Sequence, residues 1–351
     1  MLAADFVYFP LQFRRPAGTS RGILNSKESW FLKVWNIGNP GVIGVGECSL
    51  IPGLSPDPQH LVEKELVALT QNFDQADEWL HSRGSAFPAL AFALETALAD
   101  LSNGGRRKLF DNAFVNGLTG ISINGLVWMG DPSFMKSQII EKIDAGFDTI
   151  KIKVGALQFH EELSLLAYLR KEFDHRNISL RLDANGAFSA ADAIEKLKQL
   201  SDFNIHSIEQ PIKAGQPELM AWLCEKSPIA IALDEELIGI AASDDRKNLL
   251  QSIRPHYIIL KPSLLGGLNA SNAWIQLAEE LNIGWWATSA LESNIGLNAI
   301  SQWAASHQPK VPQGLGTGQL YLNNLPSPLE IKNAALWYNH KISWDLKDIG
   351  L

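Results

Sequence analysis

Cysteine is scarce in this sequence: 351 residues include only Cys48 and Cys224, far apart along the chain. Two distant cysteines cannot build the dense disulfide framework of a small secreted domain, so we expect both to be reduced, packed thiols. The first residues also lack a basic segment followed by an apolar core, and their pattern indicates a strand rather than a signal peptide. These absences favour a cytoplasmic protein.

Long apolar runs and basic clusters are missing as well. No apolar stretch approaches the roughly 18 residues needed to cross a bilayer. The net charge is −8, and no Lys/Arg cluster offsets it, which argues against a nucleic-acid partner. Hydrophobic residues make up 46% of the chain and charged residues 19%, as is typical of a globular protein. We therefore expect a soluble enzyme acting on a small molecule, without membrane or nucleic-acid partners; the sequence does not indicate its oligomeric state.

The first part of the chain, residues 1–118, is strand-like and then helical, which predicts an α+β domain. Aromatic and β-branched runs indicate strands, Gly-rich polar segments indicate loops, and Ala/Leu-rich segments indicate helices. We expect strands at residues 6–13 and 30–37, a mobile loop at 14–24, a second loop at 46–56, and helices at 58–71 and 88–102.

From residue 119 to about 325, short apolar runs recur, beginning 22 to 30 residues apart, and a helical segment follows each of the first seven. Strands that alternate with helices predict a parallel sheet, because parallel strands need crossover connections. Eight such units fit a (β/α)8 barrel, with a doubly wound open sheet as the alternative. Residues 326–351 should pack back on the N-terminal domain. The predicted strands span residues 122–127, 149–154, 179–183, 207–209, 229–233, 257–261, 284–288 and 311–315.

Three carboxylates, Asp183, Glu209 and Asp234, stand where consecutive predicted strands end. In a parallel barrel the chemistry lies at these ends, and neighbouring strands are about 4.8 Å apart. Carboxylates at such a short distance repel one another unless a cation lies among them. Hard oxygen ligands suit Mg2+, or Mn2+ in its place. Each acid alone could cap a helix, but three in register favour a metal site. Asn185 and Glu235 could support the ligands, although strand alternation points Glu235 away from Asp234, where it could simply pair with a lysine.

Lysines flank these acids in the sequence. Lys151 and Lys153 are two residues apart on one predicted strand, so both should face the barrel interior while Ile150 and Ile152 face the helices. Two inward ammonium groups should lower each other's pKa, and a lysine tuned in this way can act as a general base. Lys261 ends the sixth strand, across the barrel mouth. The layout suits removal of a proton next to a carboxylate, with the metal neutralising the charge that develops.

At these residues the sequence resembles the enolase superfamily, in its muconate-lactonizing subgroup, over the whole chain. Members have an N-terminal α+β capping domain, completed by the C-terminal segment, over a modified (β/α)7β barrel. This resemblance implies that residues 1–118 with 326–351 form the capping domain and that residues 119–325 form the barrel, without an eighth helix. The motifs that carry it are Lys151-Ile-Lys153, Asp183-Ala-Asn185, Glu209-Gln-Pro, Asp234-Glu and Lys261-Pro-Ser.

Within the subgroup, residues 46–55, 181–183, 289–296 and 314–317 most resemble members that remove water from 2-succinyl-6-hydroxy-2,4-cyclohexadiene-1-carboxylate in the menaquinone pathway. The resemblance implies that Lys153 removes the proton next to the ring carboxylate and then assists loss of the hydroxyl. It implies that Lys261 stabilises the enediolate and that Lys151 tunes Lys153. By the same resemblance, Arg181 would support the site, and Ser289 and Gly316 would contact the substrate.

Other activities fit the same motifs. A dipeptide epimerase or an N-succinylamino acid racemase would use lysines on both sides of the metal, although the Asp-x-Asp that epimerases generally carry near the eighth strand is missing from residues 314–320. A non-catalytic metal-binding barrel is a more distant alternative. Two cap segments, 14–24 and 48–56, should close over the substrate. Arg21 would there be either a carboxylate contact or a solvated loop residue.

Overall fold

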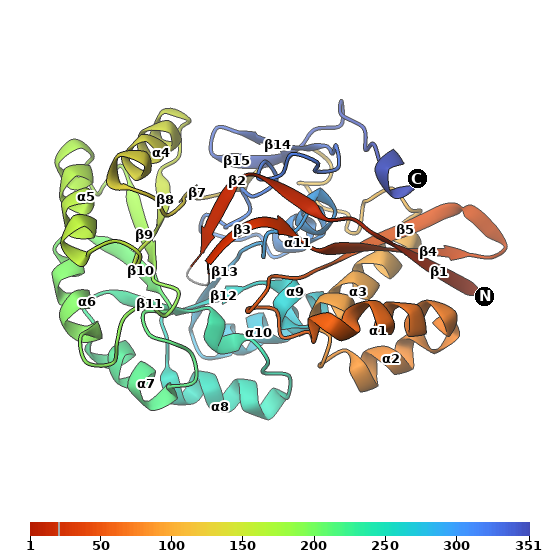
Figure 1. Cartoon of the computed structure of the whole chain (residues 1–351), viewed down its shortest axis with the longest axis horizontal. Coiled ribbons are helices and arrows are strands. Elements are labelled where there is room, and N and C mark those ends of the chain that lie inside the picture. The colour runs from red at the N-terminus through yellow and green to blue at the C-terminus, as the bar shows by residue number, and fades with distance from the viewer. Residues whose placement is uncertain (20–21) are drawn as a thin grey trace.

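The computed structural model describes residues 1–19 and 22–351, so Arg21 lies outside the described residues. An antiparallel sheet begins the chain, with β4 (Ser29–Asn36) between β1 (Leu2–Tyr8) and β5 (Asn39–Ser49). Three helices pack against it through a cluster of buried apolar residues (Figure 1). These helices are α1 (Gln59–Gln71), α2 (Ala76–Arg83) and α3 (Pro88–Ser102), with the short 3-10 helix η1 (Phe73–Gln75) between the first two. The helices predicted at 58–71 and 88–102 and the strand predicted at 30–37 are confirmed.

The predicted mobile loop at 14–24 is wrong. Most of it belongs to a hairpin of β2 (Leu11–Thr19) and β3 (Gly22–Lys27), in which Ala17 pairs with Leu24. A two-stranded ribbon with one face in solvent carries many polar residues, and such a composition is also typical of loops. The strand predicted at 6–13 is likewise two strands, because the chain leaves β1 at Phe9 and Pro10 before β2 begins.

The predicted loop at 46–56 begins too early, because β5 continues to Ser49. Gly46 suggested a turn, but it and Gly44, earlier on β5, allow close packing instead. A Cβ added to Gly46 would lie 1.9 Å from the carbonyl oxygen of Ala93, and one added to Gly44 would lie 2.1 Å from that of Ala97. Both carbonyls belong to α3, so glycine lets helix and sheet approach closely.

The second part of the chain forms a parallel sheet of seven strands that curls into a barrel (Figure 1). Its order is that of the sequence: β7 (Gly125–Val127), β8 (Thr149–Lys153), β9 (Ser179–Asp183), β10 (Ile205–Glu209), β11 (Ala230–Leu233), β12 (Tyr257–Leu260) and β13 (Gly284–Ala287). The eighth predicted segment closes the gap through single parallel bridges, Gln313 to Ile123 and Gly314 to Thr288. The barrel prediction is confirmed, and the open-sheet alternative is wrong.

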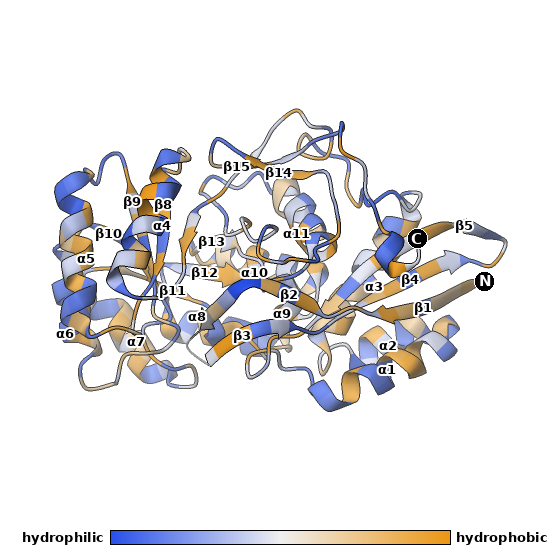
Figure 2. Ribbon diagram, turned by 45° about the horizontal axis from the view of Figure 1, so that its top comes forward, coloured by the Kyte–Doolittle hydropathy of each residue, from blue (hydrophilic) through white to orange (hydrophobic). Residues whose placement is uncertain are grey.

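Helices alternate with the barrel strands, and Figure 2 shows hydrophilic and hydrophobic residues interspersed along α5 and α6. Buried Ile150 and Ile152 on β8 belong to the apolar cluster between strands and helices, so the lysines between them take the inner face. The helices are α4 (Pro132–Asp144), α5 (Phe159–Glu172), α6 (Ala193–Ser201), α7 (Pro217–Lys226), η2 (Glu235–Leu237), α8 (Ser243–Ile253), α9 (Pro262–Leu265), α10 (Leu268–Glu280) and α11 (Asn294–Ser306). As expected, no helix occurs between residues 311 and 325, all of which are described.

The C-terminal segment returns to the first part of the chain. Strands β14 (Leu329–Lys332) and β15 (Ala335–Tyr338) form a hairpin, and β15 pairs with β6 (Ile121–Ser122). Leu346, directly before η3 (Lys347–Ile349), and Ile349 at its end join a buried cluster with Phe31 and Val45 of the N-terminal sheet. The division at residues 118 and 119 stays a prediction.

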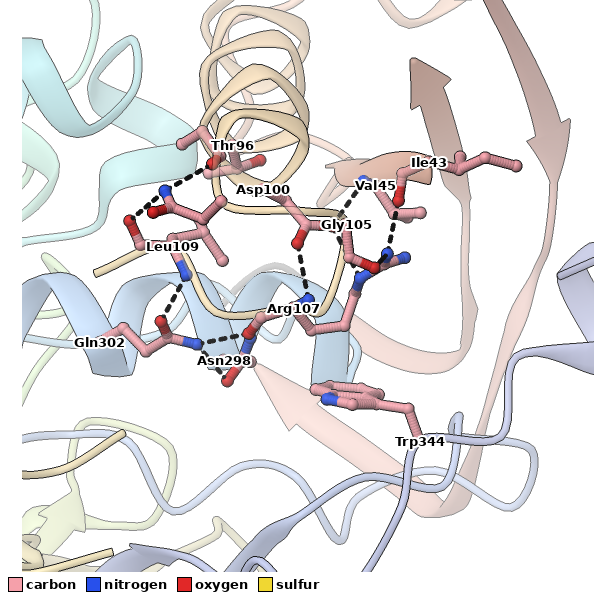
Figure 3. Close-up of polar contacts among 12 residues, drawn as sticks. Ile43, Val45, Thr96, Asp100, Gly105, Arg107, Leu109, Asn298, Gln302 and Trp344 are labelled. Atoms are coloured by element: carbon pink, nitrogen blue, oxygen red, sulfur yellow. Dashed lines mark hydrogen bonds and ion pairs between the residues drawn. The ribbon is translucent and has the colours of Figure 1, made fainter. Parts of the chain in front are cut away.

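A buried ion pair between Arg107 and Asp100 lies where the first part of the chain meets the barrel (Figure 3). Nε of Arg107 lies 2.7 Å from Oδ2 of Asp100, near the end of α3, and that oxygen also accepts a hydrogen bond from the backbone N–H of Val45. The carbonyl oxygen of Arg107 accepts hydrogen bonds from the side-chain amides of Asn298 and Gln302 on α11. These contacts fix the N-terminal sheet and α3 against a barrel helix. Within the described residues, no helix is long and apolar enough to cross a membrane.

Candidate active site

A cavity opens at the C-terminal ends of the barrel strands, and the N-terminal domain contributes to its lining through Ile51 and Leu54. These two residues belong to the cap segment 48–56 that was predicted to face the substrate. The barrel contributes both charged and apolar residues. The lining comprises Ile51, Leu54, Asn124, Leu126, Trp128, Lys151, Lys153, Asp183, Asn185, Glu235, Lys261, Thr288, Ser289, Ala290, Leu291, Gly314, Gly316 and Thr317.

The three predicted carboxylates occupy consecutive strand ends. Asp183 ends β9 and Glu209 ends β10, and the two residues pair directly in the register of these parallel strands. Asp234 follows the last residue of β11. All three are buried. A parallel sheet brings the carboxyl ends of its strands to one edge, so the spacing in the sequence becomes proximity in space.

Lys151 lies between two of these carboxylates. Its Nζ is 3.0 Å from Oδ2 of Asp183 and donates a hydrogen bond to Oε2 of Glu209. Burial disfavours the charged form of Lys151, but the neighbouring carboxylates outweigh burial and raise its pKa. The predicted lowering of the pKa by a lysine pair is therefore wrong for Lys151, because the carboxylates of Asp183 and Glu209 affect its pKa more strongly than the ammonium group of Lys153 does.

The acids respond to the same groups in different ways. Burial acts to raise the pKa of Asp183, but the ammonium groups of Lys151, Lys153 and Lys261 outweigh burial and hold that pKa below its usual range. Burial raises the pKa of Glu209 to about 7, since Lys151 offsets it only in part and the two other acids add to it. Lys261 donates from Nζ to Oδ2 of Asp234 over 2.5 Å, and nearby carboxylates raise its pKa against the effect of burial.

The donor set of this cluster suits a divalent cation. Among the residues the structure describes, no three His, Cys, Asp or Glu side chains lie close enough together to hold an ion, and Glu209 and Asp234 are each paired with a lysine. However, Oε1 of Glu209 is buried without a hydrogen-bond partner in the described part of the chain. A buried carboxylate oxygen without a donor carries a desolvation cost that a cation would relieve. Carboxylate oxygens are also the ligands that hard cations prefer.

Lys153 points to the same cluster from the end of β8. Its Nζ donates to Oδ1 of Asn185 over 2.6 Å and lies 3.3 Å from Oδ2 of Asp183. Asn185 in turn donates from Nδ2 to Oε1 of Glu235 over 3.1 Å. Glu235 lines the cavity, so its predicted orientation away from it is wrong. Strand alternation ends at Leu233, and Glu235 begins the short helix η2 instead.

The predicted substrate contacts fall into two groups. Ser289 and Gly316 line the cavity, and Oγ of Ser289 lies 2.6 Å from Oγ1 of Thr317. Arg181 does not line it. The guanidinium lies inside the barrel, 4.1 Å from the ring centre of Trp286, and donates to the carbonyl oxygen of Pro312. Arg181 is two residues before Asp183 on β9, so both side chains face the barrel interior. Arg181 therefore lies one layer of side chains deeper in the barrel than Asp183.

The apolar part of the lining was not predicted as part of the site. Leu126 lies on β7 and Trp128 directly follows it, and Ala290 and Leu291 follow β13. Apolar residues after a strand look like ordinary core in a sequence. Their common signal is position, since each lies near the end of a predicted strand, as the acids do.

Known proteins match this chain in sequence and in fold. Residues 135–339 match the family described as enolase C-terminal domain-like, and the chain belongs to this family. It is 49% identical over 357 residues to an o-succinylbenzoate synthase from Desulfotalea psychrophila strain LSv54, an alignment that covers 93% of this chain and 96% of the relative. It is 26% identical to a hydrophobic dipeptide epimerase from Enterococcus faecalis strain V583, over 77% of this chain and 75% of that protein.

Solved structures agree with the sequence relatives. The crystal structure of MenC from Desulfotalea psychrophila LSv54 matches with a TM-score of 0.85 and 45% identity, over 96% of this chain and 99% of that one. Dipeptide epimerase from Enterococcus faecalis V583, complexed with Mg and the dipeptide L-Leu-L-Tyr, matches with a TM-score of 0.82 over 97% of each chain, but at 20% identity it shows the fold alone. The resemblance drawn from the strand-end motifs is confirmed.

Proposed function

We propose that this protein is an o-succinylbenzoate synthase, a hydro-lyase that converts 2-succinyl-6-hydroxy-2,4-cyclohexadiene-1-carboxylate to o-succinylbenzoate in the menaquinone pathway. The observation that carries the proposal is the geometry of the strand ends: Lys153 on β8 and Lys261 after β12 line one cavity, and β9, β10 and β11, whose ends bear the three acids, lie between them. The 49% identity to a relative with this activity supports it.

A metal site formed by Asp183, Glu209 and Asp234 accompanies this activity. Mg2+ is the proposed ion, with Mn2+ as a substitute, because the donors are carboxylates at the ends of neighbouring strands. When bound, the ion would neutralise the negative charge that develops on the substrate carboxylate. In the structure, Lys151 pairs with Glu209 and Lys261 pairs with Asp234. Asn185 and Glu235 would support the site through the hydrogen bond that joins them.

Lys153 would carry out both proton transfers. In its neutral form it removes the proton from the ring carbon that bears the carboxylate, which breaks the C–H bond and leaves an enediolate. The same ammonium then gives its proton to the departing hydroxyl, so the C–O bond breaks, a ring double bond forms and water leaves. One lysine suffices if both groups lie on the same ring face. Asn185 holds Lys153 beside the acids through the 2.6 Å hydrogen bond.

The other lysines would act by charge. Lys261 stabilises the enediolate from the opposite side of the cavity, partly by contact with the ring face. Lys151, buried between Asp183 and Glu209, favours the ionised form of both acids and sets the electrostatic environment of Lys153. Arg181 supports the cluster from the deeper layer of the barrel rather than by touching the substrate. Ser289 and Gly316 are placed to contact the succinyl end, beside Thr317.

Epimerases share this scaffold, but one feature disfavours that activity here. The stretch from Gly314 to Leu320 has no acidic residue to hold a substrate ammonium group, and Gly314, Gly316 and Thr317 line the cavity. N-succinylamino acids lack that ammonium group, so racemisation of these compounds is the second activity that the same lysines could support.

The test is direct. Purified protein with Mg2+ should consume the cyclohexadiene substrate, with loss of its absorbance and formation of o-succinylbenzoate. Dipeptides and N-succinylamino acids should be assayed in parallel. Turnover of dipeptides without turnover of the cyclohexadiene acid would overturn the proposal, and metal binding without turnover of any carboxylic acid would indicate a non-catalytic barrel.

A further inference from the structure

One wall of the cavity, the 289–291 loop (Ser289, Ala290 and Leu291), is held in an unusual backbone conformation. Leu291 has a φ of 62°, in the left-handed region that residues other than glycine seldom adopt. Its N–H donates to Oγ of Ser289 over 3.1 Å. All three residues line the cavity. The position of this wall therefore depends on what keeps the turn in place.

Lys27, the last residue of β3 in the N-terminal domain, reaches this loop from outside the barrel. Its side chain is buried, and Nζ donates to the carbonyl oxygen of Ala290 over 2.6 Å and to that of Leu291 over 2.9 Å. Carbonyl groups of consecutive residues point in opposite directions in an extended strand. Both can accept from a single ammonium here because of the left-handed turn at Leu291, so the contact is specific to this conformation.

The ammonium of Lys27 has no carboxylate within ion-pair distance among the described residues, in contrast to the other buried lysines, Lys151 and Lys261. Burial lowers its pKa, although Glu292 and Glu47 nearby counteract this. The carboxylate of Glu47 instead accepts hydrogen bonds from the backbone N–H groups of Ser293, directly before α11, and of Gly296 on α11. Burial of an ammonium group carries a desolvation cost, which the hydrogen bonds to these two carbonyl oxygens help to offset.

Apolar contacts also join the N-terminal domain to the 289–291 loop. Leu24 of β3, with Ile51 and Leu54 of the cap segment, packs against Ala290 and Leu291 in one cluster. From the barrel side, the hydroxyl of Tyr321 donates to the carbonyl oxygen of Leu291 over 2.5 Å. The wall is thus fixed between a hairpin of the N-terminal domain and a residue that follows the eighth barrel segment.

We propose that Lys27 is a positioning residue: it sets the 289–291 loop relative to the lysines of the site and thereby determines how tightly the cavity holds the substrate. The proposal rests on the proposed function, since it assigns this wall to the substrate's succinyl end. Lys27 touches no reacting atom. Loss of its two hydrogen bonds should weaken binding of substrate and product alike and leave the proton transfer on Lys153 nearly intact.

The experiment compares Lys27→Met with Lys27→Gln, which keeps one donor without the charge. Steady-state kinetics on the cyclohexadiene acid and calorimetric titration with o-succinylbenzoate, both with Mg2+, provide the readouts. In Lys27→Met we expect KM and the product Kd to rise together by about ten- to a hundredfold, with kcat within about threefold of the original. Lys27→Gln should recover part of the affinity.

A matched control separates positioning from stability. Glu95→Gln weakens another contact between the two parts of the chain, because Glu95 accepts from the backbone N–H of Leu268 on α10, away from the 289–291 loop. It should lower the unfolding midpoint while KM stays unchanged. An unchanged KM and product Kd in folded Lys27→Met would overturn the proposal.

If Lys27→Met does not fold, an unchanged KM in Lys27→Gln overturns it in the same way. The original protein is measured first: its failure to turn over the acid contradicts the proposed function, whereas turnover that is indifferent to Lys27 contradicts only the positioning role.

Discussion

Lys153 and Asn185 meet through a hydrogen bond of 2.6 Å from Nζ to Oδ1, at the ends of two neighbouring barrel strands. The bond directs the ammonium toward the cavity that both residues line. Strand β8 fixes the Lys153 backbone, and the left-handed conformation of Asn185, with a φ of 43°, turns its amide back toward β8. A lysine held in this way is suited to a proton transfer of fixed direction.

Lys153→Ala should therefore abolish turnover. We expect a loss of at least about a thousandfold in kcat, because a positioned acid or base contributes about 10²–10⁴-fold and Lys153 would serve in both steps. The fold should persist, since the side chain lies at the cavity surface and the strand pairing does not depend on it. Kinetics and circular dichroism test this. Lys171→Ala, an exposed position on α5, is the control, and normal turnover in Lys153→Ala would refute the assignment of the base.

Removal of the metal should abolish activity reversibly. Treatment with a chelator should eliminate turnover, and Mg2+ should restore it, because the proposed ion neutralises charge on the substrate carboxylate. Calorimetry provides an independent measure: Asp183→Asn should weaken Mg2+ binding by at least about tenfold, since it replaces a charged ligand with a neutral one. Asp202→Asn, an exposed acid after α6, should bind as the original protein does. Full activity after chelation would contradict the metal site.

Much of this site follows from the sequence, because a parallel barrel converts regular spacing into proximity. The period of the strands located the barrel, and the acids and lysines at the strand ends identified the site before any contact was known. Contacts between distant segments could not be predicted in this way. The hydrogen bonds from Lys27 to residues more than 260 positions away depend on how the hairpin packs, and so does the depth of Arg181 within the barrel.

Local backbone geometry was the second source of error. Glu235 faces the cavity because the chain enters a 3-10 helix directly after Asp234, and no alternation rule applies there. The Gly-rich end of β5 looked like a loop because the helix that requires those glycines lies about fifty residues later.

Asp57 should make the protein less stable as the pH rises. The side chain is buried, Oδ1 accepts from the backbone N–H of Ala89 at the start of α3, and Oδ2 has no partner among the described residues. Burial raises the pKa of Asp57 to about 7, whereas in the unfolded chain it lies near 3.8. Between these values the folded protein retains a proton that the unfolded chain releases, so stability declines from about pH 4 to pH 7 and levels off above.

Asp57→Asn keeps the acceptor for Ala89 and removes the charge. The variant should gain stability of the order of a few kcal/mol relative to the original protein at pH 8, and the gain should vanish near pH 4. Urea unfolding across this range measures it, with the exposed Asp77→Asn as a reference for general charge effects. A difference between variant and original that does not change with pH would contradict the assignment.

The close approach of α3 to β5 predicts a large effect from a single methyl group. A Cβ on Gly46 would lie 1.9 Å from the carbonyl oxygen of Ala93 and 2.7 Å from its carbonyl carbon, and these backbone atoms cannot move without shifting the helix. Overpacking of a buried contact costs about 1–3 kcal/mol and more where backbone must move, so Gly46→Ala should lose at least about 3 kcal/mol of unfolding free energy. A Cβ on Gly41, on the same strand, would meet no atom within 4 Å, so Gly41→Ala should leave stability within about 0.5 kcal/mol. Urea denaturation of both variants tests the packing, because equal stability of the two would show that α3 does not lie directly on these glycines. Since Ser29 and Ser293 both bond to Glu47, the residue after Gly46, a displaced β5 should also raise KM by moving the loop after β13.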